Sequence, residues 1–245
     1  MNYILLIIFG LAPSIIWLLY FLRRDVHPED NSQVIKIFGY GILSALPTAL
    51  IQLGILDLLS PWKNNIWKTI FILVFSVALT EEFMKYLVVK GKILKSSHFD
   101  EAVDLPLYMI ISALGFAAAE NILIIASIGK LPFIGANSFS AVSTGQMAIL
   151  GLYRFISATF LHALSSGTLG IFLALGICNQ KNKTKLIIAG FAVAIFLHAL
   201  YNFSIMEIDN NFRFIIPIAI LINLAVVLSI GFKKLSKFKS ICQME

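Results

Sequence analysis

The feature that most limits how this chain can fold is a succession of apolar runs of about 20 residues. A helix rises about 1.5 Å per residue, so a run of this length crosses the ~30 Å hydrocarbon core of a bilayer. Seven such runs can be placed, at about residues 2–22, 35–59, 67–89, 105–128, 151–177, 186–206 and 212–232. The sequence therefore predicts an all-α membrane protein, a bundle of about seven transmembrane helices that forms one polytopic domain over residues 1–245.

Composition favours the same class. Hydrophobic residues make up 59% of the 245 positions and charged residues only 13%, and the mean hydropathy is +0.89. In soluble domains roughly a quarter of the residues are charged. This balance excludes a soluble globular domain and predicts an integral, multi-pass protein of the cell membrane. The formal net charge of +6 lies mainly in short linkers and the C-terminal tail, so we expect no nucleic-acid partner.

Lys and Arg are distributed unequally between the two ends of the predicted spans. Thirteen of them lie in one set of linkers and in the tail. The opposite set carries five, namely Lys63, Lys68, Lys130, Arg154 and Arg213. Cytoplasmic linkers of membrane proteins are enriched in Lys and Arg. We therefore predict an outside N-terminus, a cytoplasmic C-terminus and a short basic cytoplasmic tail at residues 233–245.

Few strongly polar side chains fall deep inside the predicted spans. An ionisable residue at the centre of a membrane helix costs at least ~2.5–3.5 kcal/mol, so such groups face one another or a water-filled cavity. They are Glu81, Glu82 and Lys85 on the third span, Glu120 and Asn121 on the fourth, His162 and Ser166 on the fifth, and His198 and Asn202 on the sixth. Counting about 1.5 Å per residue places the acids and imidazoles in one layer near the midplane. The sequence predicts one buried polar site within a core at about residues 67–206.

Each of these groups also has a purely structural interpretation. A Glu–Lys pair four residues apart, such as Glu81 and Lys85, can be a tie between helices. A single imidazole or amide in a membrane helix is often a hydrogen-bonding contact between helices. Acids and imidazoles at one depth on four successive spans are better explained by a common function.

The ordered motifs resemble those of PrsW-type intramembrane proteases. The motifs are Glu81-Glu82-x-x-Lys85, Phe116-x-x-x-Glu120-Asn121, His162-x-x-x-Ser166 and His198-x-x-Tyr201-Asn202, and the segment from Arg24 to Asp30 is similar to the family's juxtamembrane segment. The wider clan includes type II CAAX-processing proteases, but Glu120 stands where those enzymes carry a histidine. The resemblance implies regulated proteolysis, in which a peptide bond of a membrane-anchored protein, such as an anti-sigma factor, is hydrolysed.

Two mechanisms fit these residues. In the first, which needs no cofactor, Glu81 is the base that activates water, while Glu82 and Lys85 adjust its protonation. The remaining roles are water or proton handling by His162, oxyanion binding by His198 and Asn202, and orientation of an imidazole by Glu120, with Asn121 and Ser166 in support. In the second, His162, His198 and Glu120 bind zinc and Glu81 is the base. We favour the first because the chain has no His-Glu-x-x-His helix.

A function of another class uses the same residue types. Buried Glu, His and Lys also form proton relays, so a proton-coupled membrane transporter is the alternative. Many transporters are built from inverted repeats with matched broken helices. No such repeat is visible in this sequence. The sequence therefore favours the protease, whose partners are the bilayer and a membrane-anchored protein substrate, and makes no prediction of oligomeric state.

Overall fold

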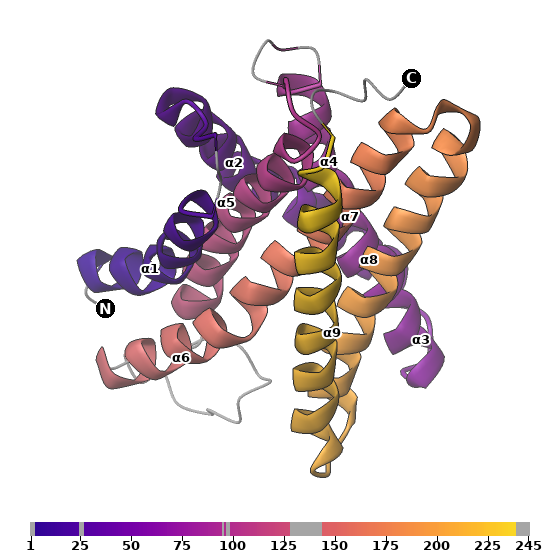
Figure 1. The fold of residues 1–245 in the computed structure, drawn as a ribbon. Coiled ribbons are helices and arrows are strands. Elements are labelled where there is room, and N and C mark those ends of the chain that lie inside the picture. The colour runs from indigo at the N-terminus through magenta and orange to yellow at the C-terminus, as the bar shows by residue number, and fades with distance from the viewer. Residues whose placement is uncertain (1–2, 25–26, 95, 97–98, 128–143, 239–245) are drawn as a thin grey trace.

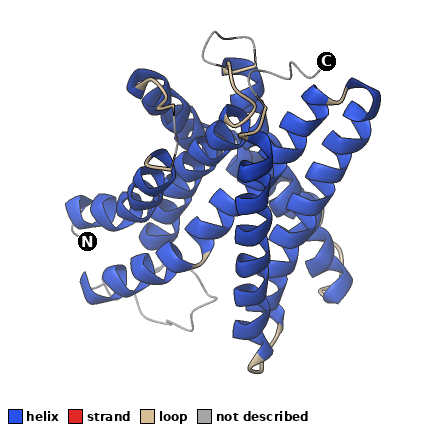
Figure 2. Ribbon diagram, viewed as in Figure 1, coloured by secondary structure: helices blue, strands red, loops and turns tan. Residues whose placement is uncertain are grey.

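The computed structural model describes residues 3–24, 27–94, 96, 99–127 and 144–238. Within these ranges the regular structure is entirely helical (Figure 2). In chain order the elements are α1 (Tyr3–Leu22), α2 (Asn31–Leu58), α3 (Ile66–Phe71), a π-helix (Ile72–Leu79), α4 (Thr80–Lys92), α5 (Asp104–Ser127), α6 (Thr144–Ile156), α7 (Ala158–Cys178), a 3₁₀ turn (Gln180–Asn182), α8 (Lys183–Glu207) and α9 (Phe212–Leu235).

Six helical segments of the described chain are long and apolar enough to cross a membrane. They are Tyr3–Leu22, Asn31–Leu58, Asp104–Ala126, Thr144–Cys178, Gln180–Glu207 and Phe212–Leu235. The third predicted span, from α3 to α4, is helical but is not one of the six; it carries Glu81, Glu82 and Lys85. The all-helical class is confirmed, while seven crossings and the orientation of the termini stay predictions.

The structure differs from the fifth predicted span in two ways. The fifth predicted span continues across a break at Ser157, which separates α6 from α7. Arg154, which the sequence assigned to an outer linker, lies inside α6 and is buried, so that assignment is wrong. Most of the link between the fourth and fifth spans, including Lys130, and the last seven residues of the predicted tail lie outside the described residues. The first three residues of that tail belong to α9.

The centre of the bundle is formed by α5 and α7. Residues 105–118 of α5 and 161–171 of α7 are continuously buried, and the two helices pack extensively against each other. In Figure 1 they run through the middle, with α1 and α2 to the left, α8 to the right and α9 in front of α7. The outer helices expose large apolar side chains, such as Leu46 and Ile222. An apolar outer surface is what a helix bundle needs in a bilayer.

Glycines allow the backbones of α2 and α5 to touch. A Cβ atom added to Gly41 would collide with the carbonyl oxygen of Ser112, and one added to Gly115 would collide with the carbonyl oxygen of Phe38. Small residues permit such close approach between membrane helices. The contact fixes α2 beside the part of α5 that leads to Glu120.

The π-helix lies directly before the two adjacent carboxylates of α4. It spans Ile72–Leu79 and packs against α8. Thr80, the first residue of α4, donates its hydroxyl to the carbonyl oxygens of Ser76 and Val77. π-helical turns are rare and occur often at functional sites. Here the wider turn sets the rotation with which Glu81 and Glu82 enter the bundle.

Candidate active site

Most of the polar residues predicted inside the spans meet where α4, α5, α7 and α8 pack together. We call the group around the two adjacent carboxylates the polar cluster: Glu81, Glu82, Lys85, Glu120, His162, Ser165, Ser166 and His198. Glu82 and Lys85 are fully buried, and Glu81, His162 and His198 are 2–4% exposed. The side chain of Glu120 is 30% exposed, so it lies nearest the edge of the cluster. Buried ionisable groups in such number require mutual pairing.

Glu82 is the fully hydrogen-bonded centre of the polar cluster. Its Oε1 accepts from Lys85 Nζ at 2.9 Å, from Ser165 Oγ at 3.0 Å and from His198 Nδ1 at 3.0 Å. Its Oε2 accepts from Ser166 Oγ at 2.6 Å. Both oxygens are therefore occupied by donors from α4, α7 and α8. Four donors thus hold this carboxylate, three of them on Oε1.

Glu81, its neighbour in sequence, has one oxygen left over. Its Oε1 accepts from Gln52 Nε2 of α2 at 3.2 Å. Its buried Oε2 accepts no hydrogen bond from the described part of the chain. That atom lies 3.6 Å from Lys85 Nζ and 3.8 Å from both His162 Nδ1 and His198 Nε2. Glu81 Oε2 is thus a carboxylate oxygen surrounded by a cation and two imidazoles.

The hydrogen bonds define the proton positions on the two imidazoles. His198 Nδ1 donates to Glu82, and His198 Nε2 lies 3.8 Å from Glu81 Oε2. An ammonium group only donates, so His162 Nδ1 accepts from Lys85 Nζ, at 2.8 Å. The proton of His162 then lies on Nε2, which donates to Glu120 Oε2 at 2.9 Å. Carboxylates orient imidazoles in the same way in metal and hydrolytic sites.

A second polar group adjoins the cluster and was only partly predicted. Arg154 Nη2 donates to Glu120 Oε2 at 2.6 Å, and Arg154 Nε donates to Asn121 Oδ1. Asn121 Nδ2 in turn donates to Thr159 Oγ1 at 3.1 Å and to the carbonyl oxygen of Gly10 at 3.3 Å. These contacts join α6, α5, α7 and α1. Sequence reasoning missed this arginine, although its spacing from Gly151 places both on the buried face of α6.

Two other contacts were missed, and one predicted residue stands apart. Ser165 and Gln52 bind Glu82 and Glu81 but lie outside the motifs, and neither residue type is distinctive in a membrane helix. Asn202, expected to bind the oxyanion, is half-buried one helical turn after His198. No hydrogen bond between Asn202 and the polar cluster is present among the described residues.

Three members of the cluster offer donor atoms for a metal ion. The ligand atoms of Glu81, His162 and His198 lie within 4.8 Å of one another. Two imidazoles and one carboxylate are a common zinc set, so the residues fit such an ion. The set differs from the predicted one because Glu120 is turned toward Arg154. Glu81 Oε2 accepts no hydrogen bond from described residues, whereas Lys85 occupies His162 Nδ1.

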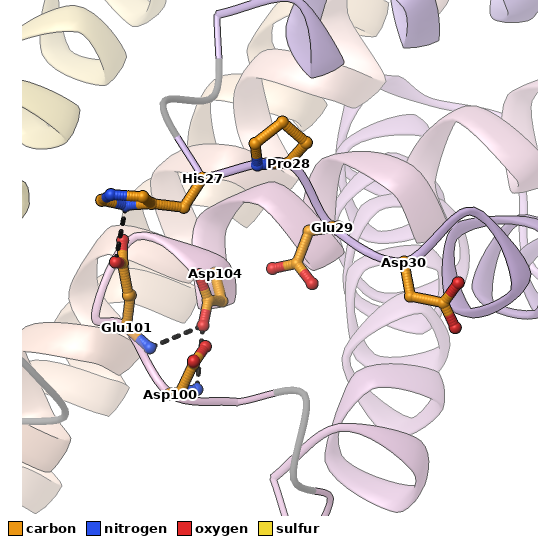
Figure 3. A pocket seen from close by; sticks show the side chains of 7 residues that line it. All are labelled: His27, Pro28, Glu29, Asp30, Asp100, Glu101 and Asp104. Atoms are coloured by element: carbon orange, nitrogen blue, oxygen red, sulfur yellow. Dashed lines mark hydrogen bonds and ion pairs between the residues drawn. The ribbon is translucent and has the colours of Figure 1, made fainter.

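A separate cavity of about 360 Å³ lies between the α1–α2 link and the start of α5 (Figure 3). Carboxylates dominate its lining, which consists of His27, Pro28, Glu29, Asp30, Asp100, Glu101 and Asp104. His27 pairs with Glu101 at 2.7 Å, and Asp104 accepts the backbone N–H groups of Asp100 and Glu101. Tyr108 donates to Glu29. Residues 27–30 of the juxtamembrane segment singled out in the sequence thus pack over the start of α5, apart from the polar cluster, while residues 25 and 26 lie outside the described residues.

Comparison with known proteins identifies the family. A family described as PrsW family intramembrane metalloprotease matches residues 29–230. A Protease PrsW from Oceanobacillus iheyensis is 28% identical over 217 residues, which cover 87% of this chain and 88% of that protein. A Protease PrsW from Bacillus subtilis is 25% identical over 239 residues, 96% of each chain. No solved structure gives a significant match.

The match runs from the juxtamembrane segment through every helix that contributes to the polar cluster. It supports the protease and not the transporter considered from the sequence, and with the six apolar helices it supports an integral, multi-pass membrane protein. The chain belongs to the PrsW family of intramembrane proteases.

Proposed function

We propose that this protein is an endopeptidase that hydrolyses a peptide bond of a membrane-anchored protein with water activated by Glu81. The observation that carries the proposal is the contrast between the two adjacent carboxylates. Glu82 is saturated with hydrogen bonds, while Glu81 Oε2 is buried, accepts none from the described residues and faces two imidazoles. A general base must reach the proton that it removes, and only Glu81 offers such an oxygen at the centre of the cluster.

The neighbouring groups support attack by this water. A water molecule has two protons to donate, and Glu81 Oε2 and His198 Nε2 are acceptors 3.8 Å apart. Glu81 takes one proton as the water oxygen bonds to the substrate carbonyl carbon. The same proton then passes to the amide nitrogen as the carbon–nitrogen bond breaks. We assign Asn202, one turn beyond His198, to the oxyanion, since amide donors stabilise such charge.

A zinc-dependent form of the same protease is the second candidate. It is favoured by the convergence of Glu81, His162 and His198 and by the description of the family as metalloproteases. Zinc bound there would lower the pKa of a bound water. We favour the metal-free form because Lys85 already places a cation against His162 Nδ1. Metal analysis of the purified protein, beside cleavage with and without chelator, separates the two.

The function is tested in cells by comparing membrane proteins in the presence of the wild-type chain and of the Glu81→Gln variant. We expect at least one membrane-anchored protein to be full-length with the variant and cut within or beside its membrane segment with the wild type. By resemblance, a regulator such as an anti-sigma factor is the first class to inspect. Identical fragment patterns at equal expression of both chains would contradict the proposal.

A further inference from the structure

We propose that Arg154 is a positioning residue, which holds Glu120 where it orients the imidazole of His162 for the reaction. The proposal rests on the protease function proposed above. It assigns a role to a residue that lies outside the four sequence motifs, on a helix that contributes no other member to the site.

One oxygen atom of Glu120 links Arg154 to His162. Glu120 Oε2 accepts from Arg154 Nη2 at 2.6 Å and from His162 Nε2 at 2.9 Å. The oxygen that fixes the imidazole is therefore the oxygen that the guanidinium fixes. The other ring nitrogen of His162 receives Lys85 Nζ at 2.8 Å. The imidazole of His162 is thus held by one contact at each ring nitrogen, and the contact at Nε2 depends on Arg154.

Charge pairing within the cluster gives a second reason. Lys85 lies 2.9 Å from Glu82 and 3.6 Å from Glu81, so its charge pairs with the carboxylates of α4. Arg154 is the Lys or Arg that contacts Glu120 within the described chain. Without it, Glu120 would be a carboxylate at the edge of a buried cluster with an imidazole as its remaining partner. Carboxylates without a cation are costly in such surroundings, and the side chain would move toward water.

The guanidinium is suited to this task in a way that an ammonium is not. Arg154 uses Nη2 for Glu120 and Nε for Asn121, and so grips two consecutive residues of α5 at once. Such a planar fork fixes direction as well as distance, while lysine offers a single charged point on a flexible stem. Asn121 is itself held by Thr159 and by the backbone of Gly10. Arg154 therefore anchors Glu120 to the junction of α1, α5 and α7.

The experiment measures kcat and KM for Arg154→Met, Arg154→Lys, Glu120→Gln and the double variant Arg154→Met/Glu120→Gln in liposomes. The probe is a fluorescence-quenched peptide of the segment that the wild-type chain cuts in cells and Glu81→Gln does not. The matched control is Arg213→Met, because Arg213 is exposed at the start of α9. Melting temperatures are recorded for every variant.

We expect Arg154→Met to lower kcat by about 100-fold, the loss that a catalytic group displaced by about 1 Å can produce. KM should stay within about threefold, since Arg154 does not touch the cluster's centre. Arg154→Lys keeps the charge and therefore the fold, and its kcat should be about tenfold higher than that of Arg154→Met. The double variant should be no slower than Arg154→Met alone, because both changes weaken the same contact between residue 120 and His162. Arg213→Met should match the wild type.

Three results would overturn the proposal. They are a wild-type kcat in Arg154→Met, losses in the double variant that equal the product of the two single losses, and no recovery in Arg154→Lys at a wild-type melting temperature. If Arg154→Met does not fold, the comparison of Arg154→Lys with Arg154→Lys/Glu120→Gln gives the same decision. Glu81→Gln is measured alongside. Full cleavage by Glu81→Gln overturns the proposed function, whereas an inactive Glu81→Gln beside a fully active Arg154→Met overturns only the role of Arg154.

Discussion

At the scale of single residues, neighbours in the sequence have different surroundings. Glu81 and Glu82 are both buried on α4, but the first has one hydrogen-bond donor and the second has four. From the spacing in the sequence, Lys85 was expected to pair with Glu81, four residues away. The structure places the ammonium nearer to Glu82, at 2.9 Å against 3.6 Å. The two carboxylates should therefore differ in what they do for stability and for chemistry.

We predict that Glu82→Gln destabilises the protein much more than Glu81→Gln does. The amide in place of Glu82 leaves the buried ammonium of Lys85 without its nearest anion, and breaking a buried pair costs about 3–5 kcal/mol. Glu81→Gln keeps an acceptor for Gln52 and leaves Lys85 paired with Glu82 at 2.9 Å, so it should cost clearly less. Thermal unfolding of the purified variants in detergent measures both. Equal losses would show that the two carboxylates share one structural role.

A second residue prediction concerns Lys85 and metal. Since its ammonium occupies His162 Nδ1, zinc can use all three donors only after Lys85 moves away. Lys85→Met should therefore raise zinc affinity at least about tenfold, the lower end of what contacts around metal ligands are worth. Calorimetric titration with zinc alone measures this, with the exposed Lys92→Met as control. Tighter zinc binding by the wild type than by Lys85→Met would contradict it.

At the scale of helices, the sequence predicted where most helices lie along the chain but not where they break or change to a π-helix. Apolar length was enough to find the six long apolar helices, because the hydrocarbon thickness sets the length of a span. The break at Ser157 and the π-helix depend on partners far along the chain. At the break, Trp17 of α1 donates to the carbonyl oxygen of Phe155 at 2.8 Å and stacks on Phe160. No local pattern announces such a contact.

The glycine contact between α2 and α5 makes a prediction with an internal control. Gly41→Ala places a methyl group against the carbonyl oxygen of Ser112 and should destabilise the protein by about 1–3 kcal/mol. Gly39→Ala, two residues earlier on the same helix, meets no atom within 4 Å and should be neutral or stabilising. Melting temperatures of the two variants test the contact. Equal effects would mean that α2 does not approach α5 this closely.

At the scale of the whole molecule, the candidate site could be predicted as a set but not as a network. Groups such as Glu120 and His162 must meet because a bilayer offers them no other partner. Which atoms pair depends on helix rotations of a few tens of degrees. Such rotations turned Glu120 toward Arg154, and this separated the predicted metal set from the set that the structure brings together.

The orientation of the molecule stays a prediction that a simple experiment decides. The distribution of Lys and Arg predicts a cytoplasmic C-terminus and an outside N-terminus. Green fluorescent protein fused after Glu245 should fluoresce, because it folds in the cytoplasm. Alkaline phosphatase fused after Asp57, near the end of α2, is active if that end lies outside and inactive if it is cytoplasmic. We expect that second fusion to be active. A dark C-terminal fusion with an inactive phosphatase would reverse the topology.

The measurement that tests the central claim most directly is cleavage of the identified substrate segment by purified Glu81→Gln in liposomes. Glu207→Gln, a change of the same kind at the exposed end of α8, is the matched control. If Glu81 is the base, its variant should retain the fold and the melting temperature but lose at least about 10²–10⁴-fold in kcat, while Glu207→Gln cleaves like the wild type. Cleavage by Glu81→Gln at the wild-type rate would contradict the account.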